Sequence, residues 1–171
     1  VNTPTPSGFE APGQKLWLKY AAEFAETVSS DAYGNAVATF NPGGSPRLMI
    51  VGHGDEIGLM VSYISSEGYL YFRSIGGVFP GILKAQRVTI HTASGPVTGV
   101  IGSVPPHLMD KNEDEKKSKI SDLFIDIGVS SREEAAKLVR IGDPITLTDT
   151  FAKLNEDILI ARAFDNRVGS W

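Results

Sequence analysis

The stretch Leu48-Met49-Ile50-Val51-Gly52-His53-Gly54-Asp55-Glu56-Ile57-Gly58 places polar side chains directly after an apolar run. Four consecutive apolar residues without alternation predict a strand that is buried on both faces, as in the centre of an α/β sheet. In open α/β sheets ligands bind beyond the carboxyl ends of the strands, and glycines let the backbone approach a ligand closely. His53 and Asp55 are therefore candidates for one corner of a metal or catalytic site.

A second stretch has the same pattern, an apolar run that is followed by polar residues. Residues 158–161 are apolar, and residues 163–169 follow as Ala-Phe-Asp-Asn-Arg-Val-Gly. If both runs belong to one sheet, His53 and Asp165 are neighbours, and a neutral imidazole with a carboxylate suits a divalent cation. Asp55 would point the same way as His53 and accept its other ring N–H, which orients the imidazole. Glu56 would point away, and a structural or surface role for it is as reasonable as a functional one.

Composition excludes several classes of function. The chain has 171 residues, of which 42% are hydrophobic, with a net charge of −4 and no cysteine. Lys and Arg are not clustered, so we expect no nucleic-acid partner, and no apolar run reaches the roughly 18 residues of a membrane span. Without cysteine, any metal must be held by His, Asp or Glu, and a cytoplasmic location is expected. Motifs of serine hydrolases and of nucleotide-binding loops are also missing.

The first 40 residues predict a helix and a hairpin. Ser7 and Glu10 fit a capping box, and apolar residues recur every fourth position over residues 11–27, which indicates an amphipathic helix. Strand-forming residues at 28–32 and 36–40 flank a Tyr-Gly-Asn turn.

The middle of the chain reads as a β-rich module. Short strands are expected over residues 69–75, 87–92, 97–101 and 144–148, and a capping box at Ser131 and Glu134 opens a helix to about Val139. The densely charged residues 110–119 predict a solvated loop. We expect an α/β domain formed by residues 1–63 and 156–171, interrupted by a β-rich insertion over residues 64–155. His91, in an expected strand, is interpreted as structural, and His107 as a loop residue or inter-domain contact.

Residues 52–61 resemble the first metal motif of the M42 family of metallo-aminopeptidases. Further landmarks of that family are matched in order along essentially the whole chain, by residues 7–10, 74–77, 99–102, 105–107, 123–128 and 163–169. The resemblance implies a zinc-peptidase-like α/β catalytic domain interrupted by an inserted β-rich dimerisation domain. It also implies a hydrolase that holds two divalent metal ions, zinc or cobalt, and uses an activated water to remove N-terminal residues from peptides. Family members form homo-oligomers in which dimers assemble into a dodecamer.

The resemblance assigns roles to particular residues. His53 would bind one metal, Asp165 would bridge both, and Asp55 would act in catalysis by orienting His53. The chain departs from the family at Gly54, where Met is usual, and at Asn166, where a second Asp is usual. Neither position is a ligand in the family, so the assignment of the ligands stands.

The chain is expected to be a fragment. It begins with Val1 and stops at Trp171, and the family's Glu-Glu pair, a further Asp ligand and the last His ligand would all follow Trp171. A general base contributes typically about 10²–10⁴-fold, and most of the metal ligands would be missing too. We therefore expect these 171 residues alone to bind zinc weakly and not to hydrolyse peptides. An incomplete sheet would also expose apolar surface and favour association.

Two alternatives stay open at this point. Some family members carry the label endoglucanase, but a glycoside hydrolase needs two carboxylates that flank the scissile bond, and Asp55 and Glu56 are expected on opposite faces. The other alternative is a non-catalytic truncated homologue whose insertion serves as an assembly module. The preferred substrate residue and the choice among Zn, Co and Mn are not fixed by the sequence.

Overall fold

The computed structural model describes residues 2–104 and 119–170, which fall into two compact units. Unit 1 is Val1–Glu56 with Asp149–Trp171, and unit 2 is Ile57–Thr148. Unit 2 is therefore inserted in sequence within unit 1. The two boundaries lie seven residues earlier than the expected ones, at 56/57 and 148/149 rather than 63/64 and 155/156. The expected first boundary would have cut a continuous strand, β3 (Gly58–Ile64).

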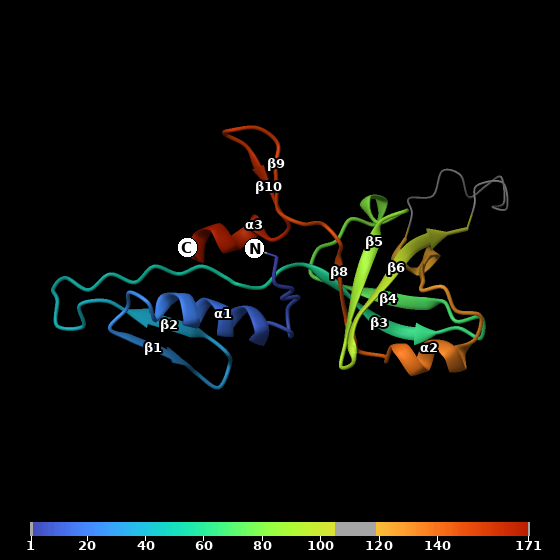
Figure 1. Ribbon diagram of the computed structural model, residues 1–171, viewed down its shortest axis with the longest axis horizontal. Coiled ribbons are helices and arrows are strands. Elements are labelled where there is room, and N and C mark those ends of the chain that lie inside the picture. Colours follow the sequence, from blue (N-terminus) through green and yellow to red (C-terminus); the bar gives the residue numbers. More distant parts are fainter. Residues whose placement is uncertain (1, 105–118, 171) are drawn as a thin grey trace. The chain divides into compact units, whose positions relative to one another are not determined.

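Unit 2 is a closed antiparallel barrel (Figure 1). Within the described residues its strand order is β3-β4-β7-β6-β5-β8, and β8 pairs with β3 to close the barrel. The further strands are β4 (Leu70–Ile75), β5 (Arg87–Thr92), β6 (Gly95–Ser103), β7 (Leu123–Asp126) and β8 (Pro144–Leu147). The strands expected from the sequence in this region are confirmed.

Alternating side chains build the core of the barrel. In β5, Val88 and Ile90 are fully buried while their neighbours are more exposed, as the two-residue period of a strand requires. Short helical segments complete the unit: η1 (Pro80–Ile82), η3 (Ile120–Asp122) and α2 (Arg132–Leu138). The buried apolar cluster consists of Leu59, Val61, Ile64, Leu70, Phe72, Leu83, Val88, Ile90, Ile101, Leu123, Ile125, Ala135, Val139 and Ile145.

The expected cap of α2 is confirmed in its main contact. Ser131 is the N-cap, and its hydroxyl accepts from the backbone N–H of Glu134. The Glu134 carboxylate accepts from the backbone N–H of Ser130, one residue earlier than a capping box predicts.

Unit 1 contains α1 (Ala11–Ala21), packed against a hairpin of β1 (Thr27–Ser30) and β2 (Ala36–Thr39). A second hairpin, β9 (Ala152–Lys153) with β10 (Leu159–Ile160), stands apart from the first in Figure 1 and leads to α3 (Phe164–Arg167) and η4 (Val168–Ser170). The helix expected to reach residue 27 ends at Ala21. The reason is local: the Glu26 N–H donates to the carbonyl of Thr39, so the backbone has already joined the hairpin.

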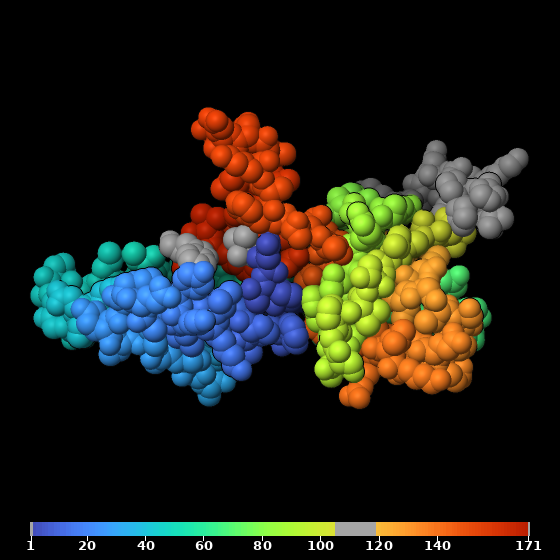
Figure 2. All heavy atoms as spheres, in the orientation of Figure 1, coloured from blue at the N-terminus to red at the C-terminus, as the bar shows by residue number. Residues whose placement is uncertain are grey.

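The expected buried strand at Leu48–Val51 was wrong. These residues form no described strand, and they are 75 to 85% exposed. A strand buried on both faces needs neighbours on both sides, and the described residues supply none here. The visible part of this segment, in cyan, lies at the surface of unit 1 in Figure 2. Residues 158–161 also differ from the expectation, because β10 is an exposed strand of a small hairpin.

No helix in the described part of the chain is long and apolar enough to span a membrane. His107 and the charged run up to residue 118 lie outside the described residues.

Candidate functional site

The segment that carries His53 lies against the turn that follows Asp165. A Cβ atom added at Gly52 would lie 2.7 Å from the carbonyl carbon of Gly169, closer than real Cβ atoms approach. Only glycine allows this contact, which brings the residues after position 52 next to η4. Ala163 adopts a left-handed conformation with φ of 63°, and Asp165 and Asn166 depart from helical angles. Asp165 therefore sits on a sharp turn, with a cis bond to Asn166, rather than on a regular helix.

The structure brings the three predicted site residues together. Nδ1 of His53 lies 2.9 Å from Oδ1 of Asp55, and Nε2 lies 3.2 Å from Oδ1 of Asp165. The side chains are exposed to solvent by 53% for His53, 34% for Asp55 and 97% for Asp165, so the site is open. The expected proximity of His53 and Asp165 is observed, although neither follows a buried strand.

The two carboxylates control the protonation of His53. Desolvation lowers the pKa of His53, but the hydrogen bonds to Asp55 and Asp165 together raise it above the ordinary value of 6.5. A carboxylate can only accept, so the ring nitrogen that faces Asp55 carries a proton. In the absence of a cation, a proton is favoured on the nitrogen that faces Asp165 as well.

Ser7 takes part in this arrangement, which sequence reasoning missed. Its hydroxyl donates to Oδ2 of Asp55 over 2.5 Å, so the expected capping role of Ser7 was wrong. This hydrogen bond is the main cause that lowers the pKa of Asp55, and burial opposes it in part. Glu10 itself is the N-cap residue of α1, and its carboxylate accepts from the N–H of Gly8.

The donor atoms fit part of a metal site. Ligands at about 2.0–2.1 Å from a tetrahedral zinc ion are about 3.3 Å from each other, close to the separation of the His53 nitrogen and the Asp165 oxygen. Asp55 is hydrogen-bonded to the other ring nitrogen, as in carboxylate–histidine–zinc arrangements. Within residues 2–104 and 119–170, however, no group of three or more His, Asp or Glu side chains could hold a metal ion. The pair could therefore supply two ligands but not a complete coordination sphere.

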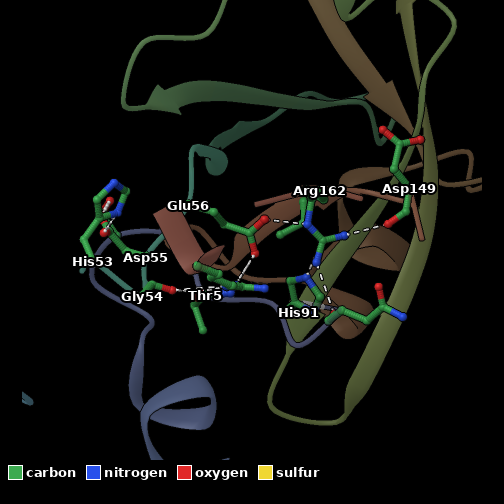
Figure 3. Close-up of polar contacts among 12 residues, drawn as sticks. Thr5, His53, Gly54, Asp55, Glu56, His91, Asp149 and Arg162 are labelled. Atoms are coloured by element: carbon green, nitrogen blue, oxygen red, sulfur yellow. Dashed lines mark hydrogen bonds and ion pairs between the residues drawn. The ribbon is translucent and has the colours of Figure 1, made fainter. Parts of the chain in front are cut away.

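Glu56 has a different role from the adjacent Asp55. Its side chain is 1% exposed and points away from His53 (Figure 3). Oε2 accepts from Nε of Arg162 at 2.5 Å, and Oε1 accepts from Nη2 of Arg167 at 3.1 Å and from the N–H of Thr5 at 2.9 Å. Two cations and a backbone donor compensate the buried charge, so Glu56 is a structural carboxylate.

Arg167 links this buried group to the segment that carries His53 and Asp55. Its Nε donates to the carbonyl of Gly54 at 3.3 Å, and its Nη2 donates to the hydroxyl of Thr5. Desolvation is the main cause that lowers the pKa of Arg167, and Glu56 opposes it. A signal for this contact exists in the sequence, because Glu56 and Arg167 are opposite charges in two motifs that were expected to meet. Nothing in the sequence indicates Thr5.

His91 lies in β5 of unit 2, where its Nε2 is 2.9 Å from the hydroxyl of Thr146 in β8. This cross-strand contact agrees with the expected structural role.

Comparison with known proteins shows to which family the chain belongs. A model of the M42 glutamyl aminopeptidase family matches residues 34–171. The chain is 36% identical over 171 residues to the lysyl aminopeptidase of Pyrococcus furiosus, covering 98% of this chain and 49% of that relative. The chain thus spans about half the length of the curated relatives it matches.

Solved structures give the same result. The TET aminopeptidase of Thaumarchaeota archaeon SCGC AB-539-E09 matches with a TM-score of 0.93 and 38% identity, over 98% of this chain and 48% of that one. The TET1 peptidase of Pyrococcus horikoshii, which can assemble into a tetrahedron or a large octahedral shell, matches with 0.86 and 35%, over 98% and 50%. A structure named endoglucanase from Thermotoga maritima matches with 0.79 and 30%, over 96% and 48%. From the match of the family model to residues 34–171, the chain belongs to the M42 glutamyl aminopeptidase family.

Proposed function

We propose that this chain is part of a metal-dependent aminopeptidase that removes N-terminal residues from peptides. The observation that carries the proposal is the arrangement of His53 between two carboxylates, with Asp55 on one ring nitrogen and Asp165 on the other. The aminopeptidase names of the relatives support the same activity.

Each residue has a defined task in this proposal. His53, through Nε2, and Asp165, as the bridging carboxylate, would hold the metal ions. Asp55 accepts the Nδ1–H of His53 and so keeps Nε2 directed at Asp165, while Ser7 holds Asp55. When bound, a pair of zinc or cobalt ions polarises the scissile carbonyl and lowers the pKa of a water.

The 171 residues alone are proposed to be inactive. The described residues offer only two suitably placed metal ligands, and the proposed roles include no general base. Relatives named for lysyl and for glutamyl residues both match this chain, so the preferred N-terminal residue is left open.

A glycosidase mechanism through Asp55 and Glu56 is disfavoured by the geometry. Glycoside hydrolases need two carboxyl groups on either side of the scissile bond. Asp55 faces His53, whereas Glu56 is buried between two arginines, so the two cannot flank one substrate. The Thermotoga maritima structure is named an endoglucanase, but this name does not identify another pair of carboxylates in the present chain.

We further propose a cytoplasmic homo-oligomer. The dodecamer named for PhTET1-12s and the tetrahedron or octahedral shell named for the Pyrococcus horikoshii TET1 peptidase support oligomerisation. On unit 2, Phe79 and Ile82 are exposed by 69% and 50%, which makes this face a candidate contact between subunits. Sedimentation velocity of the full-length gene product tests this proposal: Phe79→Ser should shift the protein to smaller species, and an unchanged distribution would reject this face.

The activity is tested on the full-length gene product, stripped of metal and reloaded with zinc or cobalt. Aminoacyl p-nitroanilides should be hydrolysed, N-acetylated analogues should not, and carboxymethylcellulose tests the glycosidase alternative. His53→Ala and Asp165→Asn should each lower kcat/KM by about 100-fold or more, since even changes to groups behind the ligands cost 10–100-fold. His91→Gln is the matched control. Full activity of His53→Ala, or hydrolysis of cellulose in place of peptides, would reject the proposal.

A further inference from the structure

The two segments that carry the candidate ligands are joined by one buried guanidinium. Arg167 follows Asp165 by two residues on the same turn, and its Nε donates to the carbonyl of Gly54, between His53 and Asp55. The same carbonyl accepts from the hydroxyl of Thr5 at 2.7 Å. The peptide unit that separates His53 from Asp55 is therefore held by two donors.

Glu56 fixes the position of that guanidinium. Nη2 of Arg167 donates to Oε1 of Glu56 and to the hydroxyl of Thr5, so its planar fork reaches three acceptors on two segments. The Arg167 side chain is only 9% exposed, and the Glu56 side chain 1%. A buried fork that is hydrogen-bonded through both Nε and Nη2 has little freedom to move.

From these contacts we propose that Arg167 is a positioning residue for the His53–Asp165 pair. It sets the separation of the two ligands by tying the Asp165 turn to the carbonyl of Gly54, with Glu56 as its counter-charge. The inference rests on the proposed function, in which this pair holds a metal ion.

Arg162 contacts the same Glu56 as Arg167 but differs from it in its other partners. Arg162 donates Nε to Oε2 of Glu56 and also bonds the carbonyls of Asp149 and Asn2. Both arginines thus support the buried charge, but the bond to Gly54 belongs to Arg167. A lysine at position 167 could keep the charge near Glu56, yet its single ammonium cannot reproduce the planar fork.

The test compares Arg167→Lys with Arg162→Lys in the full-length gene product. Three quantities are measured for each: the melting temperature, the cobalt dissociation constant from visible absorption, and kcat separately from KM. Arg167→Lys should weaken cobalt binding by about 10-fold or more and lower kcat with little change in KM. Arg162→Lys should lower the melting temperature to a similar extent while cobalt binding changes by less than about threefold.

A second pair of variants covers the case in which Arg167→Lys does not fold. Thr5→Val keeps the size of the side chain and removes the hydroxyl that bonds Gly54, whereas Thr5→Ser keeps the hydroxyl. Thr5→Val should weaken cobalt binding by about 10-fold, and Thr5→Ser should restore it to within about threefold of the wild type.

The outcomes separate this inference from the proposed function. Equal losses of cobalt affinity in Arg167→Lys and Arg162→Lys, in proportion to their melting temperatures, would overturn the positioning role alone. The same holds if Thr5→Val and Thr5→Ser bind cobalt alike. A wild-type protein that neither binds cobalt nor cleaves peptides would overturn the proposed function and this inference with it.

Discussion

The interiors of the two units differ in the kind of side chain that each one buries. Unit 2 closes its barrel around a cluster of aliphatic and aromatic side chains. In unit 1 the buried side chains include Thr5, Glu56 and Arg167, while the apolar run at residues 48–51 is exposed. The unit without the candidate site therefore has a buried apolar core, whereas the unit that contains it has a buried ionic network whose members depend on one another.

This difference matters for the site. In unit 1 the buried charged residues lie close in sequence to the candidate site residues. Glu56 directly follows Asp55, and Arg167 follows Asp165 by two positions. Stability and ligand placement are thus coupled in unit 1, whereas core changes in unit 2 should leave the local geometry of His53 unchanged.

The largest effect is expected from Glu56→Ala. Removal of the carboxylate leaves two largely buried arginines without their counter-charge, which should cost about 3–5 kcal/mol of unfolding free energy. Hydrogen exchange resolved by residue should show the loss in unit 1 and unchanged protection in β5 and β6 of unit 2. Glu133→Ala, at an exposed position of α2, is the control. A loss of protection spread evenly over both units would contradict the comparison.

The reverse experiment is Ile90→Ala. This side chain is fully buried in the barrel, so its truncation should cost about 2–5 kcal/mol. The loss should be confined to unit 2 in the same exchange measurement. Ile50→Ala, at an 82% exposed position of unit 1, should leave protection almost unchanged. If Ile50→Ala were as destabilising as Ile90→Ala, the run at residues 48–51 would have to be buried.

A smaller effect on stability is expected from replacing the exposed run. Leu48→Ser with Ile50→Ser should change the unfolding free energy of the chain by no more than about 0.5 kcal/mol. Self-association should fall, because the exposed apolar surface is reduced. Sedimentation velocity at several concentrations measures this change, and an unaltered association constant would show that another surface is responsible.

The smallest effect concerns protonation in the metal-free protein. His53 should titrate above 6.5, because its hydrogen bonds to Asp55 and Asp165 favour the imidazolium. A raised pKa in the folded state stabilises the fold below the unfolded pKa, and this contribution is lost as the pH rises through the folded value. NMR of the imidazole carbons gives the midpoint, which Asp55→Asn should lower. A wild-type midpoint at or below 6.5 would contradict the described contacts.

Sequence reasoning located the site better than the fold around it. Local patterns predicted most strands of unit 2, because alternation and turn residues act over a few positions. The proximity of His53, Asp55 and Asp165 was also predicted. The exposure of Leu48–Val51 was not predicted, because an apolar run does not reveal whether neighbouring strands are present. The local pattern at Ser7 predicts a helix cap, whereas its actual partner, Asp55, lies 48 positions away and leaves no local signal.

Anomalous X-ray diffraction from crystals of the full-length gene product grown with zinc tests the central claim most directly. The account predicts a zinc peak at about 2.0–2.2 Å from Nε2 of His53 and from a carboxylate oxygen of Asp165, with Asp55 still bonded to Nδ1. Zinc bound elsewhere, with Nε2 of His53 still hydrogen-bonded to Asp165, would contradict it.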